Sequence, residues 1–180
     1  MRVLAICGSL QARSANLALL QAMAASAPPD VEVIVFDGLR DLPHFNPDLQ
    51  SAGPPDTVTR WRRALAESDA LVIACPEYGF SLPGALKNGI DWAIGSGELE
   101  AKVVAVTAAV PAAGRGLRGL QALRDTLAAV RATIVGGEPI VKGDGFEAAA
   151  AALLGELVQA VRSVTLRSRE TNHPSGDTDS

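Results

Sequence analysis

Short runs of apolar, often β-branched residues alternate along the chain with segments whose apolar residues recur every three or four positions. Such runs are typical of buried strands when polar residues, glycine or proline bound them, and the longer periodic segments are typical of amphipathic helices. The pattern therefore predicts a β-α unit repeated five times. The predicted strands lie at residues 2–7, 31–36, 70–75, 102–108 and 133–135, and the last one could resume at 139–141.

Each predicted helix carries one apolar face that would pack on a sheet. Strands that are apolar throughout favour a parallel sheet covered on both sides, and right-handed crossovers then favour a doubly wound, three-layer sandwich. We therefore expect an α/β fold with a five-stranded parallel sheet of order 2-1-3-4-5. The predicted helical faces are Leu17, Leu20 and Ala24; Val58, Trp61 and Leu65; Leu86, Ile90 and Ile94; Leu120, Leu123 and Leu127; and Leu154, Leu157, Val158 and Val161.

Length and composition favour a single domain with a full core. The chain has 180 residues, of which 48% are hydrophobic, and this size and composition support burial rather than disorder. We expect the domain to span residues 1–167, and we expect the Ser/Thr/Asp/Asn-rich segment 168–180 to be a disordered tail. Residues 37–56 are rich in Pro, Asp and Gly and predict a long irregular connection of the kind that often lines a site or an interface.

Charge and hydropathy narrow the class of protein. The net charge is -4, with no basic cluster beyond Arg60, Arg62 and Arg63, which argues against a nucleic-acid partner. The longest apolar run, Val103–Ala113, is shorter than the roughly 20 residues of a membrane-spanning helix, so no membrane association is expected. The segment before Gly8 is too short for a signal-peptide core, and we expect a cytoplasmic protein.

The cysteines and histidines do not form a reactive cluster in the sequence. Cys7 and Cys75 each lie near the end of a predicted strand, where a buried, unreactive thiol is a more common outcome than a catalytic one. His44 and His173 are isolated, and no spacing of His, Cys, Asp and Glu resembles a metal site.

The first candidate site is the turn that follows the first predicted strand, residues 8–16. Ser9, Ser14 and Asn16 offer neutral hydrogen-bonding groups, Arg13 adds a cation, and the start of the next helix exposes backbone N–H groups. This combination suits a terminal phosphate monoester, and it is neither a Walker loop nor a G-x-G-x-x-G fingerprint. The alternative is that Ser14 or Asn16 simply caps the helix while Arg13 is solvated.

The second candidate site is the loop and helix start that follow the third predicted strand. Pro76 and Pro83 stiffen the loop, and Gly79 and Gly84 permit a close backbone approach that a side chain would forbid. A planar ring could pack against such a backbone. Tyr78 is the one tyrosine of the chain, although it could equally be a packing residue, and Glu77 could be a solvated charge.

These two segments resemble the flavodoxin-like NAD(P)H-dependent FMN reductase family, which includes quinone, chromate and azo-dye reductases. Residues 8–16 are similar to the family's Gly-Ser-Leu-Arg-x-x-Ser-x-Asn. Residues 76–92 are similar to its Pro-Glu-Tyr-Asn-x-Ser-x-Pro-Gly-x-Leu-Lys-Asn-x-Ile-Asp-Trp. The resemblance covers residues 1 to about 165. It implies FMN as the cofactor and NADPH or NADH as co-substrate.

The resemblance also implies a role for each matching residue. Ser9, Arg13, Ser14 and Asn16 would hold the FMN phosphate, while Pro76, Glu77, Tyr78 and Gly79 would pack along the isoalloxazine. The chain departs from the family pattern in three places. Gln11 stands for the family's usual Arg, and Gly79 stands for its usual Asn. The third flavin-facing loop, which includes Ala109, reads Ala108–Gly116 where the family tends to have Ser and Gly residues.

The resemblance implies an oxidoreductase in which hydride passes from NAD(P)H to the flavin and on to quinones, free flavin or other small electron acceptors, with no catalytic side chain. The alternative is a flavin-binding electron carrier or sensor with little turnover. A third possibility is an α/β protein that has lost FMN binding and serves only in assembly. Arg115 and Arg118 are candidates for contacting the NADPH phosphate or for surface or interface pairing. Members of this family tend to form dimers or tetramers, so the resemblance implies a homodimer or homotetramer.

Overall fold

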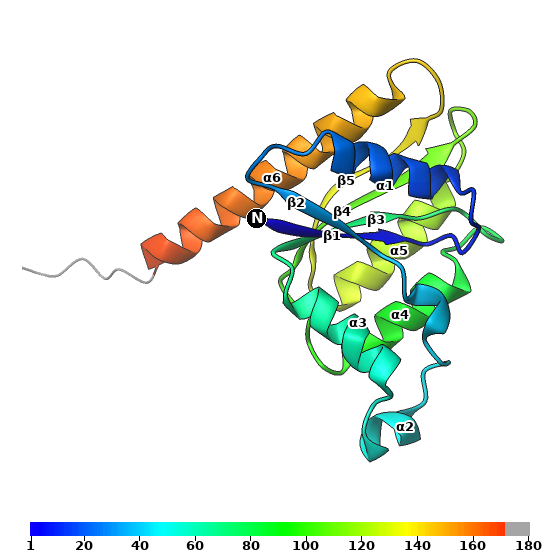
Figure 1. The fold of residues 1–180 in the computed structure, drawn as a ribbon, viewed down its shortest axis with the longest axis vertical. Coiled ribbons are helices and arrows are strands. Elements are labelled where there is room, and N and C mark those ends of the chain that lie inside the picture. Colours follow the sequence, from blue (N-terminus) through cyan, green and yellow to red (C-terminus); the bar gives the residue numbers. More distant parts are fainter. Residues whose placement is uncertain (172–180) are drawn as a thin grey trace, which may run out of the picture.

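Five parallel strands form one sheet in the computed structural model, which describes residues 1–171 (Figure 1). The order across the sheet is β2-β1-β3-β4-β5, which confirms the predicted flavodoxin-like topology. The strands are β1 (Arg2–Cys7), β2 (Glu32–Phe36), β3 (Ala70–Ala74), β4 (Val103–Val110) and β5 (Thr133–Val141).

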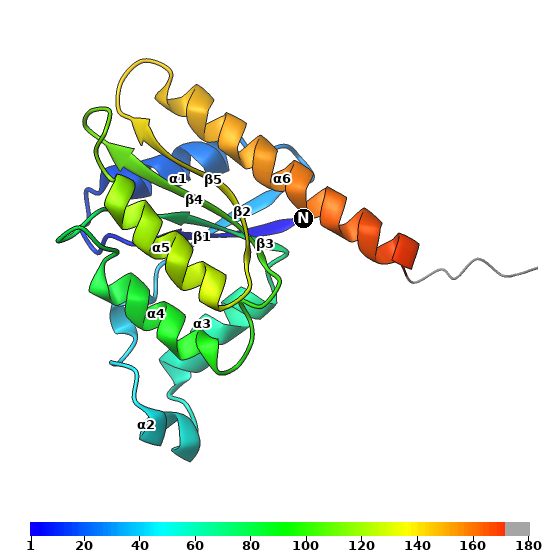
Figure 2. The same ribbon diagram turned by 180° about the vertical axis from the view of Figure 1, so that it is seen from behind.

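Helices cover both faces of the sheet and give the molecule three layers (Figures 1 and 2). Two helices pack together on one face, and three lie on the other. On the first face lie α1 (Ala15–Ala25) and α6 (Phe146–Thr171); on the second lie α3 (Asp56–Ala66), α4 (Gly84–Ile94) and α5 (Leu117–Ala129).

Burial on both faces explains why the strands read as continuous apolar runs. Successive side chains of a strand point to opposite sides. In β1, Val3 and Ala5 pack toward α1 and α6, whereas Leu4 and Ile6 pack toward α3, α4 and α5. The sheet therefore divides two apolar cores and leaves the loops at its ends to carry polar chemistry.

The structure refines several sequence predictions. The connection 37–56 is partly helical, with a 3-10 turn at Leu39–Asp41 and a short helix α2 at Pro47–Ala52. Strand β5 runs without a break through an irregularity opposite Val106 and Ala108, where Gly136 and Gly137 have positive φ angles. The polypeptide accommodates the extra residue there because glycine tolerates these φ angles.

Two predicted apolar faces are displaced. In α1 the residues that reach the core are Leu19, Leu20 and Met23, whereas Leu17 and Ala24 are only partly buried. Ile94 is 50% exposed at the end of α4. Helix α6 continues to Thr171, beyond the predicted boundary at 167, and residues 172–180 of the predicted tail lie outside the described residues.

By length and composition alone, α6 is apolar enough over Phe146–Arg167 to cross a membrane. Its first half, however, buries an apolar face against the sheet and α1. Core helices of soluble proteins can have the same length and apolar composition. The packing against the sheet and α1 accounts for the apolar residues of the first half of α6. The buried residues are Ala150, Leu153, Leu154, Leu157 and Val158.

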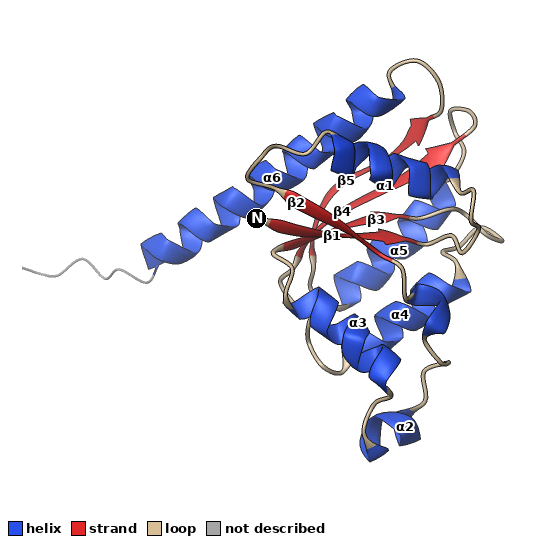
Figure 3. Ribbon diagram, in the orientation of Figure 1, coloured by secondary structure: helices blue, strands red, loops and turns tan. Residues whose placement is uncertain are grey.

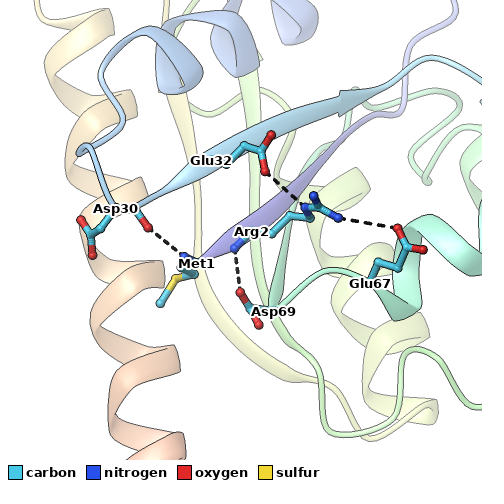
Figure 4. Close-up of polar contacts among 6 residues, drawn as sticks. All are labelled: Met1, Arg2, Asp30, Glu32, Glu67 and Asp69. Carbon is cyan, nitrogen blue, oxygen red and sulfur yellow. Dashed lines mark hydrogen bonds and ion pairs between the residues drawn. The ribbon is translucent and has the colours of Figure 1, made fainter.

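A polar cluster around Arg2 holds the amino ends of the strands (Figure 4). The Arg2 backbone N–H donates to the Asp69 carboxylate at 2.7 Å, and the Arg2 guanidinium pairs with Glu32 at 3.2 Å and Glu67 at 3.6 Å. Exposed pairs of this kind each contribute about 0–1 kcal/mol. The cluster serves the fold, and the candidate site lies at the opposite edge.

Candidate active site

The loops after β1, β3 and β4 gather at the carboxyl edge of the sheet, toward which the strand arrows point (Figure 3). The order in which strands are added reverses between β1 and β3. The chain leads from β1 outward to β2 on one side of the sheet, and from β3 outward to β4 on the other side. Ligands of open α/β sheets bind in the crevice at such a switch point.

Close backbone packing joins the first two loops. The Gly8 N–H donates to the Ala74 carbonyl at 2.9 Å. A Cβ atom added at Gly8 would lie 3.2 Å from both Pro76 and Leu86. Glycine at this position therefore lets the end of β1 lie directly against the loop that follows β3.

The first loop ends in a capped helix with unpaired backbone donors. Ser14 is the N-cap of α1, and its Oγ accepts a hydrogen bond from the Asn16 N–H at 3.2 Å. Within residues 1–171, the N–H groups of Ala12, Arg13 and Ala15 have no hydrogen-bond acceptor. Free N–H groups at the positive end of a helix dipole are suited to an anion.

Side-chain contacts connect this turn to its neighbours. The Ser9 Oγ lies 3.4 Å from the Tyr78 hydroxyl and accepts a hydrogen bond from the Gln11 N–H at 3.3 Å. The Asn16 side chain is buried and accepts a hydrogen bond from the Ala109 N–H at 2.9 Å. The capping role weighed for Ser14 is thus present, and Asn16 additionally links α1 to β4. The side chains of Gln11 and Arg13 are exposed.

The tip of the second loop is a two-residue turn. Tyr78 and Ser81 exchange backbone hydrogen bonds of 3.0 and 3.1 Å. Gly79 and Phe80 between them have φ angles of +57° and +64°, as a type I′ turn requires. This conformation suits Gly79 and strains Phe80. Phe80 is 67% exposed, and its ring centroid lies 4.2 Å from the Arg118 guanidinium carbon.

Glu77 is not a solvated charge. Its carboxylate accepts hydrogen bonds from the N–H groups of Arg118 at 2.9 Å and Gly119 at 3.0 Å, in the first turn of α5. A negative charge there is favourable to the helix dipole. The contact fixes the second loop against α5. Arg115, by contrast, is exposed in the loop before α5.

The second half of the motif, residues 84–92, has a structural role that the sequence reasoning missed. Asn88 accepts a hydrogen bond from the Phe45 N–H at 2.7 Å and donates one to the Pro43 carbonyl at 2.9 Å, and the Trp92 indole donates to the same carbonyl at 2.8 Å. An amide and an indole four residues apart lie on one helical face. This spacing could have indicated that Asn88 and Trp92 bind the same segment, which is the backbone at Pro43 and Phe45.

Both thiols are buried, as predicted. Burial raises the pKa of Cys75 from 9.0 to about 12, and the nearby Glu77 charge adds to the increase. Burial also raises the pKa of Cys7. A thiol in this state is neutral at pH 7 and is a poor nucleophile. Among residues 1–171 no group of three or more His, Cys, Asp and Glu side chains could hold a metal ion; His173 lies outside this range.

The two loops together fit FMN. The turn at 12–15 offers free N–H groups and the Arg13 cation for a phosphate, while a Cβ atom at Gly79 would meet nothing within 4 Å, so this backbone is open to a ring. Ser9 and Tyr78 connect the two halves. A doubly wound sheet with this site defines a flavodoxin-like mononucleotide-binding protein.

Comparisons with known proteins agree with this class. The sequence profile of the NADPH-dependent FMN reductase family matches residues 1–145. The NAD(P)H-dependent FMN reductase of Pseudomonas aeruginosa is 41% identical over 92 residues, which cover 51% of this chain and 49% of that protein. A quinone reductase of Pseudomonas putida is 34% identical over 128 residues, 69% of this chain and 68% of that protein.

A solved structure agrees as well. The flavoenzyme NAD(P)H:(acceptor) oxidoreductase FerB of Paracoccus denitrificans superimposes with a TM-score of 0.79 at 25% identity, covering 90% of this chain and 97% of that one. The chain belongs to the NADPH-dependent FMN reductase family. The description of this family names NADPH and FMN. The match spans about half the length of the Pseudomonas aeruginosa relative.

Proposed function

We propose that this protein is an FMN-dependent oxidoreductase that takes reducing equivalents from NAD(P)H and delivers them to quinones, free flavin or other small acceptors. The observation that supports the proposal most directly is the contact between the Ser9 and Tyr78 hydroxyl groups. It joins the loop that carries the anion-binding turn at 12–15 to the loop whose backbone is exposed at Gly79. When bound, FMN supplies the electron-transfer chemistry, and the protein supplies binding and orientation.

Each site residue has a proposed task. Ser9, Gln11, Arg13 and Ser14 surround the phosphate with hydroxyl, backbone and cationic donors. Asn16 and Ala109 set the position of the third loop relative to the first. Pro76, Glu77, Tyr78 and Gly79 form the wall against the ring, with Glu77 held in place by α5.

The direct test is a flavin titration followed by reduction. Purified protein should be yellow or become yellow with added FMN, and anaerobic NADPH or NADH should then bleach it. A protein that ignores FMN contradicts the proposal. If flavin binds but NAD(P)H oxidation stays at background with quinone, free FMN and oxygen supplied, the protein is an electron carrier or sensor instead.

The phosphate assignment has its own test. Arg13→Ala should weaken FMN by about tenfold, since a charge-assisted contact is among the stronger hydrogen bonds, and should leave riboflavin affinity unchanged because riboflavin has no phosphate. Equal losses for both flavins would refute the assignment. The matched control is Arg63→Ala, an exposed arginine on α3, on the opposite face of the sheet.

We also propose a cytoplasmic homodimer or homotetramer. Tyr78, Phe80 and Leu117 are large, exposed side chains around the site, at 53%, 67% and 47% exposure. A cluster of exposed apolar surface is typical of an interface. Light scattering of the purified protein gives the mass directly, and a monomer at micromolar concentration would contradict this part of the proposal.

A further inference from the structure

A cavity of about 450 Å³ opens between the start of α1 and the start of α6. The two helices pack together on one face of the sheet (Figure 1). The cavity wall includes the turn at 12–15, so the cavity is continuous with the turn that suits an anion. Its other wall comes from the loop between β5 and α6, which the family resemblance did not include among the site loops. The polar and aromatic residues lining it are Arg13, Ser14, Gln21, Lys142, Phe146 and Glu147.

Charges in this cavity favour an anion. Arg13 and Lys142 both line it, both are exposed, and neither has an ion-pair partner among the described residues. Glu147 is the one carboxylate in the lining. The starts of α1 and α6 both open onto the cavity, and each adds the partial positive charge of a helix amino end.

The backbone fixes where Lys142 lies. Its N–H donates to the Val110 carbonyl at 2.9 Å, which continues the pairing of β5 with β4 by one residue. The chain then turns through Gly143 and Gly145, with φ angles of +132° and +84°, and the Phe146 N–H closes the turn on the Gly143 carbonyl at 3.2 Å. Lys142 is therefore attached to the sheet rather than to a free loop tip.

We propose that Lys142 supplies the second cation of the phosphate site and that Glu147 opposes it, so that these two residues set the affinity for the phosphate of FMN. A phosphate monoester carries a charge of about -1.5 to -2 at pH 7. Arg13 neutralises only part of this charge. The inference rests on the proposed function, because it assigns residues to the phosphate end of the same site.

The charge assignment predicts effects of opposite sign from two neighbours in one cavity. Lys142→Gln removes attraction and should weaken FMN, whereas Glu147→Gln removes repulsion and should tighten it. A purely structural role for either side chain would not produce this pair of signs. Riboflavin should respond to neither substitution, because it lacks the phosphate.

The experiment is a fluorescence-quenching titration of the flavin-free full-length chain with FMN and with riboflavin, at low and high salt. We expect Lys142→Gln to weaken FMN by about 5–10-fold and Glu147→Gln to tighten it by about 2–3-fold, with both effects shrinking at high salt because screening is stronger there. The charge-matched control, Arg63→Gln on α3, should leave FMN affinity unchanged.

Two outcomes overturn the proposal. If Arg13→Gln weakens FMN while Lys142→Gln and Glu147→Gln leave it unchanged, the phosphate site stands and Lys142 is not part of it. If Lys142→Gln weakens FMN and riboflavin equally, its role is structural. A wild-type chain that binds neither flavin refutes the proposed function itself, so the two failures are distinguishable.

Discussion

The buried side chain of Asn16 accepts a hydrogen bond from the backbone N–H of Ala109, at 2.9 Å across 93 positions of sequence. Asn16 lies in the first turn of α1, and Ala109 lies near the carboxyl end of β4. One amide thus joins the phosphate turn to the strand that leads into the third loop. Its exposure of 5% means that water does not compete for the contact.

Replacing Asn16 by Ala leaves a partly buried N–H at Ala109 without its acceptor. An unsatisfied buried donor costs about 1–3 kcal/mol, so we expect the free energy of unfolding to fall by that amount in urea titrations monitored by circular dichroism.

Asn16→Asp separates stability from binding. Its carboxylate can still accept the Ala109 hydrogen bond, so stability should fall less than in Asn16→Ala. FMN affinity should fall more, because a negative charge then lies beside the turn that binds the phosphate. If both variants lose FMN in proportion to stability, Asn16 acts only through the fold.

The fold was predictable because its signals are local and repeated. Residues 2–7 and 70–75 are apolar without interruption, and their burial on both faces is what a covered parallel sheet requires. Right-handed crossovers favoured a doubly wound sheet, and five strands suggested the order 2-1-3-4-5. The face of α1 was displaced because apolar residues lie on several sides of the whole helix. Periodicity alone therefore did not select Leu19 and Met23 over Leu17 and Ala24.

The sequence indicated which segments form the candidate site, but not which contacts join them. Spacing located the loops at 8–16 and 75–83, but it did not show that Glu77 caps α5 or that Lys142 faces the same cavity as Arg13. Glu77 and Arg118 are 41 positions apart in the sequence, and Arg13 and Lys142 are even further apart. These contacts depend on the packing of β4, β5 and the helices after them, and no local pattern encodes that geometry.

Gly119 is the residue that lets α5 approach the second loop. A Cβ atom there would lie 2.9 Å from the Glu77 Cα and 3.2 Å from the Ser81 carbonyl oxygen, both backbone atoms. Gly119→Ala should therefore displace the loop, costing about 1–3 kcal/mol as an overpacking substitution and lowering FMN affinity. Chemical denaturation and flavin titration measure the two effects.

Gly155→Ala is the matched control for this prediction. Gly155 lies within α6, and a Cβ atom there would meet nothing within 4 Å. Alanine at an exposed helix interior should raise stability by about 1 kcal/mol and leave flavin affinity unchanged. A Gly119→Ala variant that behaves in the same way would show that the close approach does not constrain the loop.

Phe80 holds a strained conformation although the residue is largely exposed. A bulky residue at φ +64° costs about 1–3 kcal/mol, and the contact with Arg118 returns about 0.5–1 kcal/mol. Phe80→Gly should therefore raise the melting temperature or leave it unchanged. If the ring serves NAD(P)H or a small acceptor, kcat/KM should fall several-fold in the same variant, and full activity would show that the ring serves neither.

Cys75 gives the stability a specific dependence on alkaline pH. Its pKa is 9.0 in an unfolded chain and about 12 in the native state, chiefly because of burial. Between these values the native state holds a proton that the unfolded state has lost, so the stability from this group is complete below pH 9 and declines as the pH rises toward 12. The decline is at most about 1.4 kcal/mol per pH unit.

The variant Cys75→Ala isolates this effect, because every other titrating group is common to both proteins. Removing the buried thiol should cost stability at pH 8, and the cost should shrink by about 1 kcal/mol at pH 10, where the wild type alone has lost the contribution of the neutral thiol. Urea unfolding of both proteins at the two pH values measures the difference. A cost that stays constant from pH 8 to pH 10 would mean that the native thiol titrates at its ordinary pKa.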